Sequence, residues 1–193
     1  MKKISILLVD DHAAIRHGLR ALLELEPDFK VLGEVENGRQ AVKFVRRNPP
    51  DVVVMDLAMP VPGGLQATRQ ILDQAPRTKV LVLTSYGDDA CVDRLMEAGA
   101  SGFLIKQTAV NDLLRAIREV KNNKPFFTPA IAQRLQQRYE ADQQWQPSMA
   151  RLSFPGRIAQ LLSTLPPPAS AHSGMAAGFS AALLESIPAQ DGG

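Results

Sequence analysis

The feature of this sequence that most restricts its fold is the alternation of two kinds of segment over residues 1–125. Short apolar runs rich in β-branched residues occur at Ile4–Val9, Lys30–Val35, Asp51–Met55, Val80–Thr84 and Gly102–Lys106. The segments between them carry apolar residues at helical spacing. Buried strands that alternate with amphipathic helices are typical of a parallel sheet covered on both faces. The sequence therefore predicts an α/β fold with a doubly wound, five-stranded parallel sheet.

Composition indicates a soluble globular protein. Hydrophobic residues make up 45% of the chain and charged residues 22%, and no stretch approaches the roughly 18 apolar residues that a membrane span needs. The apolar run after Met1 stops at Asp10 without a small-residue cleavage site, so we expect a strand rather than a signal peptide. The single cysteine, Cys91, excludes an internal disulfide and fits a reducing cytoplasm.

The composition changes in the last third of the chain. Lysine does not occur after Lys124, while Pro, Ala, Ser and Gly become frequent, as in residues 165–178. We therefore expect a first domain over residues 1–124, a linker with a helix over residues 125–150, and a poorly defined region over residues 151–193.

Charged and hydroxyl side chains stand at the carboxyl ends of the predicted strands: Asp10, Asp11, Asp56, Thr84 and Lys106. In an open parallel sheet these ends meet at one edge, where ligands bind. Three carboxylates held together repel one another unless a cation lies among them, and an all-oxygen site suits Mg²⁺. A lysine and a hydroxyl nearby would complete a cradle for a phosphoryl group.

These residues resemble a known family. Asp10-Asp11, Asp56 within MDLAMP, Thr84 within VLT and Lys106 within GASGFLIK are similar, in order, to the receiver domain of bacterial two-component response regulators over residues 3–123. The resemblance implies the CheY-like strand order 2-1-3-4-5. It also implies a cytoplasmic regulatory protein that catalyses only its own phosphorylation and dephosphorylation, with a sensor histidine kinase as partner.

The resemblance assigns a role to each matching residue at the carboxylate cluster. Asp56 is the expected phosphoacceptor, a carboxylate nucleophile that attacks the phosphorus of a phosphohistidine. Asp11, Asp56 and the backbone carbonyl of Ala58 are expected to bind Mg²⁺, and Asp10 to act through metal-bound water. Loose phosphoryl-transfer transition states are stabilised mainly by positioning and opposite charge, so the first step needs no general base.

Three further residues are expected to sense the phosphoryl group. Lys106 would pair with a phosphoryl oxygen, and Thr84 would move its hydroxyl toward the group. Phe103 occupies the family's switch-aromatic position, three residues before Lys106, and would turn inward. Taken alone, Thr84 could be a β-branched strand residue and Phe103 a core residue.

Other candidate sites have structural interpretations. We expect His12 and His17 to be surface residues, because no second His, Cys or carboxylate lies at a spacing that would form a zinc site. Gly63-Gly64 is expected to form a turn rather than a phosphate loop, because no Lys-Ser/Thr follows. Cys91 is expected to be a small core residue.

The output region is ambiguous. Residues 124–140 resemble the linker of the NarL/FixJ subgroup, whose members end in a LuxR-type helix-turn-helix that binds DNA as a dimer. Leu152, Ser153 and Leu162 match the start of that domain, but Pro155-Gly156 replaces its usual Arg-Glu pair and Pro166-Pro167-Pro168 forbids a helix. We hypothesise that this output domain is degenerate or absent. The alternative is a small divergent helical domain.

Three classes of function fit the sequence. The first is a transcription regulator gated by phosphorylation and homodimerisation, with the dimer formed near the fourth and fifth predicted helices. The second is a receiver that acts only through protein contacts. The third, an aspartate-nucleophile phosphatase of the haloacid dehalogenase type, fits least, because its DxDxT motif follows the first strand, whereas the predicted nucleophile here is Asp56.

Overall fold

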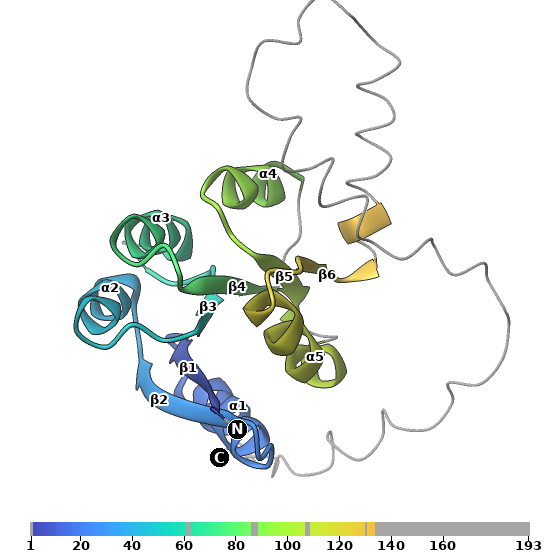
Figure 1. The fold of residues 1–193 in the computed structure, drawn as a ribbon. Helices are drawn as coiled ribbons and strands as arrows, with labels where there is room; N and C mark the ends of the chain where they lie inside the picture. Colours follow the sequence, from blue (N-terminus) through green and yellow to red (C-terminus); the bar gives the residue numbers. More distant parts are fainter. Residues whose placement is uncertain (1, 61–62, 86–88, 107–108, 130, 134–193) are drawn as a thin grey trace, which may run out of the picture.

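The structure is a computed structural model, which describes residues 2–60, 63–85, 89–106, 109–129 and 131–133. Over these residues the chain forms one six-stranded sheet in the order β2-β1-β3-β4-β5-β6, with all neighbouring strands parallel (Figure 1). The predicted parallel α/β fold and the order of its first five strands are confirmed.

The elements follow one another along the chain in the predicted alternation. The strands are β1 (Ile4–Val9), β2 (Phe29–Val35), β3 (Val52–Asp56), β4 (Lys79–Thr84), β5 (Gly102–Ile105) and β6 (Phe126–Phe127). The helices are α1 (Ala13–Glu24), α2 (Gly38–Arg47), α3 (Gly64–Gln74), α4 (Asp89–Glu97) and α5 (Ala109–Lys121). Gly63 and Gly64 were expected to form a turn. In the structure Gly63 is the N-cap of α3 and Gly64 is its first residue.

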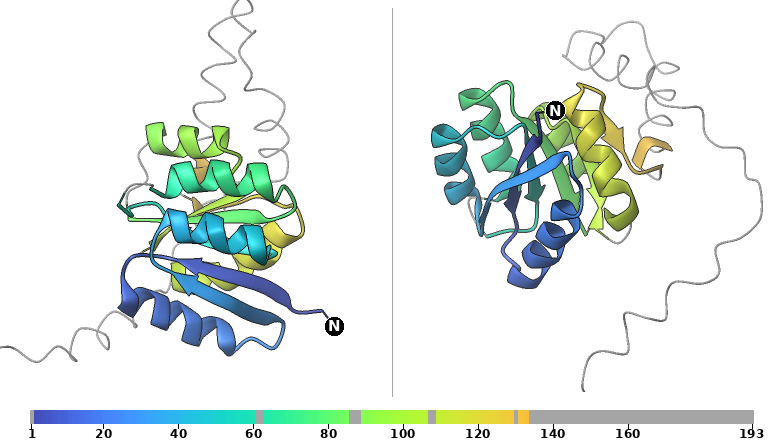
Figure 2. Two further views of the ribbon diagram at one scale, coloured as in Figure 1. Left: turned by 90° about the vertical axis from the view of Figure 1, so that its left-hand side faces the viewer. Right: turned by 60° about the horizontal axis from the view of Figure 1, so that its bottom comes forward.

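The sheet separates two hydrophobic cores, because successive strand residues point to opposite faces. Leu7 and Val53 pack in the core beneath α2, α3 and α4, whereas Ile6 and Val54 pack in the core beneath α1 and α5. Figures 1 and 2 show these two helical layers on either side of the sheet. Burial on both faces explains why the strands read as continuous apolar runs.

The sixth strand was not predicted. Phe126 pairs with Gly102 and Phe127 with Phe103, so β6 extends the sheet beyond β5. Both residues were expected to belong to the linker, because a strand of two residues is too short to show the alternating pattern of a strand. After Thr128 the chain begins a helical turn, and most of the predicted linker helix lies outside the described residues.

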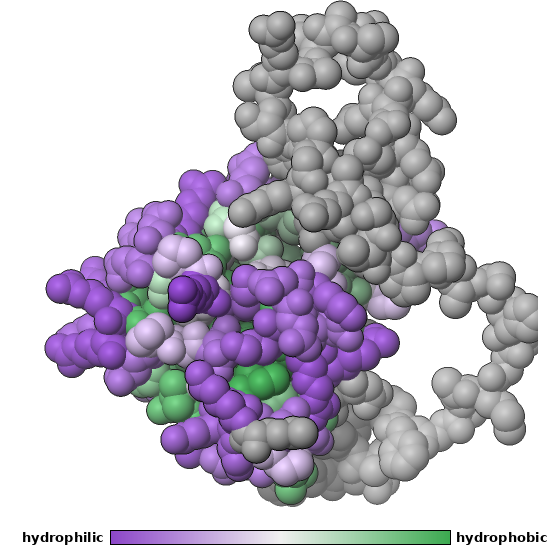
Figure 3. Space-filling view, viewed as in Figure 1, coloured by the Kyte–Doolittle hydropathy of each residue, from purple (hydrophilic) through white to green (hydrophobic). Residues whose placement is uncertain are grey.

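The described surface is mainly polar. In the view of Figure 3 hydrophilic residues cover most of it, and hydrophobic residues show between them in small areas. Ile15, at 37% exposure, and Leu25, at 80%, are large hydrophobic residues exposed on or just after α1. Among the helices that the structure describes, none combines the length and apolarity needed to cross a membrane.

Asp51 joins three elements at the amino-terminal edge of the sheet. Its Oδ2 accepts hydrogen bonds from the backbone N–H of Ser5 at 2.9 Å and from the Ser5 hydroxyl at 2.8 Å. Its Oδ1 pairs with Lys121 at the end of α5. Burial alone would raise the pKa of Asp51, but the hydrogen bonds from Lys121 and Ser5 and the charge of Lys121 outweigh it and hold this pKa below its usual value.

This lowered pKa predicts how stability depends on pH. The Asp51 contribution is fully present above the unfolded pKa, about 3.9, and is lost as the pH falls through the lower folded value. We expect Asp51→Asn to reduce the free energy of unfolding by about 1–3 kcal/mol at pH 7 and by progressively less below about pH 4. Urea unfolding between these pH values would measure this, with the exposed Asp73→Asn as control; a deficit that stayed constant into acid would contradict it.

Candidate functional site

The predicted site residues gather at the carboxyl edge of the sheet because three of its central parallel strands, β1, β3 and β5, end there. Asp10 follows β1 and is 2% exposed, and Asp56 is the last residue of β3 and is 1% exposed. Lys106 follows β5 directly. The order of the strands therefore brings together side chains that are far apart in the sequence.

Lys106 bridges the two buried carboxylates. Its Nζ lies 2.8 Å from Asp10 Oδ2 and 2.9 Å from Asp56 Oδ2, and its side chain is only 15% exposed. Burial lowers the pKa of Lys106, but its hydrogen bond to Asp10, its close contact with Asp56 and the charges of both carboxylates outweigh burial, so this pKa lies above its ordinary value. The ammonium is therefore charged at neutral pH and holds the ends of β1, β3 and β5 together.

The backbone around Asp56 is closely packed. The N–H of Ala58 donates a hydrogen bond of 3.1 Å to Asp56 Oδ1, which fixes the orientation of the carboxylate. Gly64, the first residue of α3, lies against the backbone of Asp56 and Leu57. A Cβ on Gly64 would overlap the carbonyl oxygen of Asp56 and lie 2.9 Å from Leu57 Cα. Glycine at this position lets α3 begin against the end of β3.

His12 is a surface residue, as expected, but the reason given for excluding it from a ligand cluster is wrong, because carboxylates lie within reach of its ring. Its ring Nδ1 lies 2.8 Å from Asp11 Oδ1 and 3.1 Å from Asp10 Oδ1, although 61% of the side chain is exposed. One ligand atom from each of Asp10, Asp11, His12 and Asp56 falls within 4.8 Å of the others. The signal in the sequence was the position of His12 directly after the Asp10-Asp11 pair.

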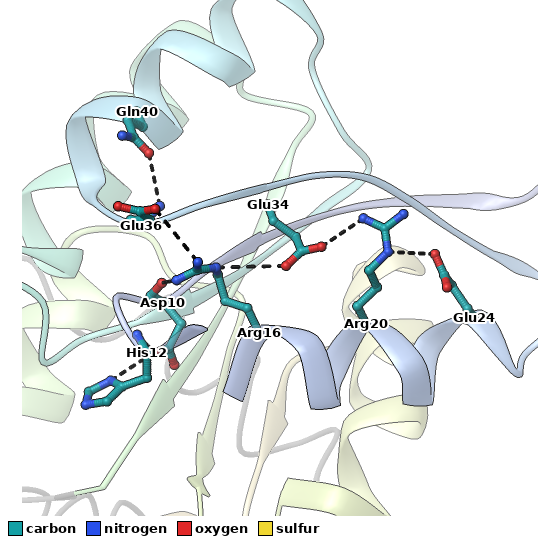
Figure 4. A network of polar contacts seen from close by, with 8 residues as sticks. All are labelled: Asp10, His12, Arg16, Arg20, Glu24, Glu34, Glu36 and Gln40. Atoms are coloured by element: carbon teal, nitrogen blue, oxygen red, sulfur yellow. Dashed lines mark hydrogen bonds and ion pairs between the residues drawn. The ribbon is translucent and has the colours of Figure 1, made fainter. Parts of the chain in front are cut away.

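Arg16 stabilises the backbone at Asp10 and was not predicted from the sequence to belong to the site. It is the buried basic residue of α1, and its Nη1 donates a 2.6 Å hydrogen bond to the backbone carbonyl of Asp10. Its guanidinium also faces Glu34 and Glu36, each at 3.9 Å. Figure 4 shows this network continuing from Glu34 to Arg20. The network ties the carboxyl ends of β1 and β2 to α1.

Thr84 and Phe103 lie on the adjacent strands. Thr84 is the last residue of β4, is 2% exposed, and is paired with Ile105. Phe103 is 1% exposed and packs in the core beneath α2, α3 and α4. Phe103 was expected to turn inward, but its ring is already buried in this structure. The ring therefore has no outward position from which it could turn. The switching roles of Thr84 and Phe103 stay predictions.

The donor set fits a divalent cation. Asp10, Asp11 and Asp56 supply three negative charges against the one positive charge of Lys106, which leaves an excess of two when His12 is neutral. Asp56 Oδ2 is buried and, among the described residues, accepts no hydrogen bond of good geometry despite its ion pair with Lys106. Carboxylate oxygens with unused lone pairs are the ligands that Mg²⁺ prefers.

The family follows from a direct comparison. A family model described as "Response regulator receiver domain" matches residues 6–118, more than half of the 193 residues. The chain belongs to this family. The matched range contains Asp10, Asp56 and Lys106, so the receiver domain includes the whole carboxylate cluster.

Relatives of known description agree with this assignment. The response regulator UvrY of Escherichia coli (strain K12) is 41% identical over 132 residues, which cover 68% of this chain and 61% of UvrY. The transcriptional regulatory protein DegU of Brevibacillus brevis is 36% identical over 137 residues, which cover 71% of this chain and 58% of DegU. The chain thus spans about three fifths of the length of these relatives.

A solved structure extends the agreement to the fold. The crystal structure of a LuxR-family two-component response regulator from Aurantimonas sp. SI85-9A1 has a TM-score of 0.69 and is 34% identical; the match covers 72% of this chain and 99% of that one. Together these relatives place the receiver in the NarL/FixJ subgroup. The chain therefore carries the receiver domain of response regulators, which is a regulatory family rather than one of classical enzymes.

Proposed function

We propose that this response regulator accepts a phosphoryl group on Asp56 from a sensor histidine kinase. The observation that carries the proposal is the environment of Asp56: its Oδ2 is buried, accepts no hydrogen bond of good geometry from the described residues, and lies 2.9 Å from the Lys106 ammonium. A carboxylate oxygen at the end of a strand that contacts one cation and accepts no such hydrogen bond is suited to act as a nucleophile.

Asp11, Asp56 and the backbone carbonyl of Ala58 would hold Mg²⁺, with Asp10 acting through a metal-bound water. The excess of two negative charges and the unused oxygen of Asp56 support this assignment. When bound, the ion supplies positive charge that offsets the charge of the phosphoryl oxygens during transfer.

The chain's own residues account for the transfer step. A carboxylate oxygen of Asp56 forms a bond to phosphorus as the phosphorus–nitrogen bond of the kinase phosphohistidine breaks, and the imidazole leaves with the bonding electron pair. Lys106 is placed to pair with a phosphoryl oxygen, since its Nζ already lies beside Asp56. The hydrogen bond from Ala58 to Asp56 Oδ1 restricts rotation of the carboxylate. Positioning of this kind lowers the barrier without a general base.

The acyl phosphate would then change the end of β4. Thr84 would turn its hydroxyl toward the phosphoryl group, and Phe103 would adjust its packing in the core. Phe103 pairs with Phe127 of β6, and the backbone N–H of Thr128 donates to the Phe103 carbonyl at 3.2 Å. A shift of β5 would therefore reach the start of the linker.

We further propose the division into a receiver at 1–124, a linker at 125–150 and an output remnant at 151–193. Phosphorylation would promote a cytoplasmic homodimer that acts in transcriptional control. The role in transcription is supported by the relative DegU, a transcriptional regulatory protein. The alternative is a receiver that signals only through protein contacts. Residues 134–193 lie outside the described residues, so the proposal for them rests on sequence.

Mapping of the phosphoryl group tests the central proposal. The full chain, incubated with acetyl phosphate and Mg²⁺, should gain one acid-stable but hydroxylamine-labile phosphoryl group. Borohydride reduction followed by peptide mass spectrometry should locate it at Asp56, and removal of Mg²⁺ with a chelator should prevent it. Modification at another residue, or labelling that does not require a divalent ion, would refute the assignment.

Charge predicts weak direct binding to DNA. Residues 143–193 carry only Arg151 and Arg157 against Glu185 and Asp191. Because each neutralised phosphate contributes about −0.9 to the slope of log K against log salt, we expect the tail to contribute no more than about −2. Duplex binding by the phosphorylated full chain and by a chain ending at Asp142 would measure this contribution. A much steeper slope that disappears on truncation would show a working DNA-binding domain.

A further inference from the structure

The imidazole of His12 stands at the solvent side of the carboxylate cluster and belongs to it. Its Nδ1 is 2.8 Å from Asp11 Oδ1 and 3.1 Å from Asp10 Oδ1. Each of Asp10, Asp11, His12 and Asp56 offers one ligand atom within 4.8 Å of the other three. Atoms that share one ion at coordination distances of about 2.0–2.2 Å lie no further apart than roughly this value.

The position of His12 is fixed by its backbone, while its side chain has no structural task in the helix. His12 is the N-cap of α1, and its backbone N–H donates to Asp10 Oδ1 at 2.8 Å. Its carbonyl accepts the first bond of the helix, from Arg16 at 3.1 Å. The ring makes no capping hydrogen bond. Serine, threonine, asparagine or aspartate would cap the helix better, so capping does not explain a histidine here.

The ring's contacts alone have a simpler interpretation, in which the Nδ1–H of His12 donates to Asp10 Oδ1, lies close to Asp11 Oδ1 and neutralises part of the cluster. This arrangement competes with the ion, because the nitrogen faces the same carboxylate oxygens that an ion would use. A neutral imidazole has one nitrogen with a free lone pair. When an ion lies among the carboxylates, a lone pair on His12 Nδ1 that faces the ion is favourable, whereas an N–H at the same position is not.

We propose that His12 Nδ1 is a protein ligand of the divalent ion at this site, beside Asp11 and Asp56. The inference rests on the proposed function, since it assumes that these carboxylates hold an ion. An imidazole nitrogen adds little to the binding of Mg²⁺, which prefers oxygen, but it strengthens the binding of Co²⁺ and Zn²⁺ and, to a smaller extent, of Mn²⁺. His12 therefore shifts the site from an all-oxygen Mg²⁺ site toward first-row transition metals.

Electron spin-echo spectroscopy of Mn²⁺ tests the ligand directly, on the full chain without a histidine tag. We expect ¹⁴N modulation from a directly bound imidazole in the wild type and its loss in His12→Ala. His17→Ala is the matched control, because His17 is an exposed histidine on the same helix and lies outside the cluster. It should keep the signal. Modulation that persists in His12→Ala, or is absent from the Mn²⁺-bound wild type, overturns the proposal.

Affinity measurements give a second readout. His12→Ala should weaken Mn²⁺ binding by at least about tenfold. It should change Mg²⁺ binding by less than about threefold, because Mg²⁺ gains little from nitrogen. His12→Asn is a second variant, which supplies a side chain able to cap α1 should His12→Ala fold poorly. Equal losses for both ions would overturn the proposal.

The outcomes separate this inference from the function on which it rests. Suppose that Asp56→Asn abolishes the binding of Mn²⁺ and Mg²⁺ but the wild type shows no nitrogen ligand. The proposed site then stands, and only the role of His12 is removed. Absence of any divalent binding to the wild-type cluster removes both.

Discussion

Asp56→Asn is expected to abolish formation of the acyl phosphate while the receiver stays folded. The amide is similar in shape to the carboxylate but is not a nucleophile toward phosphorus at neutral pH. Its Oδ1 can still accept the hydrogen bond from the Ala58 N–H that now reaches Asp56 at 3.1 Å. Lys106 keeps its second partner, Asp10, at 2.8 Å. The packing around position 56 is therefore preserved while the reactive group is removed.

The measurement is the incorporation of phosphate from acetyl phosphate, read by intact-protein mass spectrometry together with a thermal unfolding curve. We expect incorporation at background and a stability change of no more than about 1–2 kcal/mol. Asp73→Asn, the same chemical change at an exposed position on α3, should label like the wild type. Labelling that persisted in Asp56→Asn, or an equal loss in Asp73→Asn, would show that Asp56 is not the acceptor.

The sequence predicted this cluster because its geometry follows from topology. Parallel strands end at one edge, so Asp10, Asp56 and Lys106 had to meet once β1, β3 and β5 were assigned to one sheet. The strands themselves were recognisable because burial on both faces makes each a continuous apolar run. Prediction was reliable where a periodic pattern or a topological rule determined the result.

Features set by single side chains could not be predicted in this way. His12 joins the cluster through its ring orientation, and Arg16 through a long side chain that reaches the Asp10 carbonyl. Neither depends on periodicity. The two-residue strand β6 forms because the edge of β5 offers unpaired backbone groups, which is a tertiary effect. Apart from the position of His12 next to the Asp10-Asp11 pair, local sequence gives no signal for these contacts.

The movement of Thr84 and Phe103 could not be predicted for a different reason. Both residues stand where the resemblance placed them, at the end of β4 and within β5. A switch is defined by two conformations, so a sequence pattern predicts the positions of these residues but not their movement. The burial of Phe103 at 1% exposure shows that this ring is core in the state described.

Lys106→Met should destabilise the fold strongly, in a way that Mg²⁺ can reverse. The variant keeps the length and packing of the side chain but leaves Asp10 and Asp56 facing each other without their shared cation. Removal of one partner from a buried pair costs about 3–5 kcal/mol, and the 15% exposure of Lys106 favours the lower end of this range. Since the pKa of Lys106 lies above its ordinary value of 10.5, its stabilising charge is fully present at pH 7 and is lost only at higher pH.

The response to Mg²⁺ follows from the charge of the cluster. Without Lys106 the three carboxylates carry an excess of three negative charges instead of two, so they should bind a divalent ion more tightly. An ion present at about 100 times its Kd stabilises the folded state by about 2.7 kcal/mol, and tighter binding by the variant adds to this at equal concentration. Mg²⁺ should therefore recover most of the stability lost in Lys106→Met.

Urea unfolding with and without Mg²⁺ measures both effects. Lys121→Met is the matched control, because Lys121 pairs with Asp51 at the opposite edge of the sheet, away from the cluster. It should be destabilised to a smaller extent, since its side chain is 39% exposed, and Mg²⁺ should stabilise it only as much as the wild type. If Mg²⁺ raised the stability of Lys106→Met by no more than that of Lys121→Met, the carboxylate cluster would not be the place where the ion binds, and the Mg²⁺ site proposed around Asp56 would have to be abandoned.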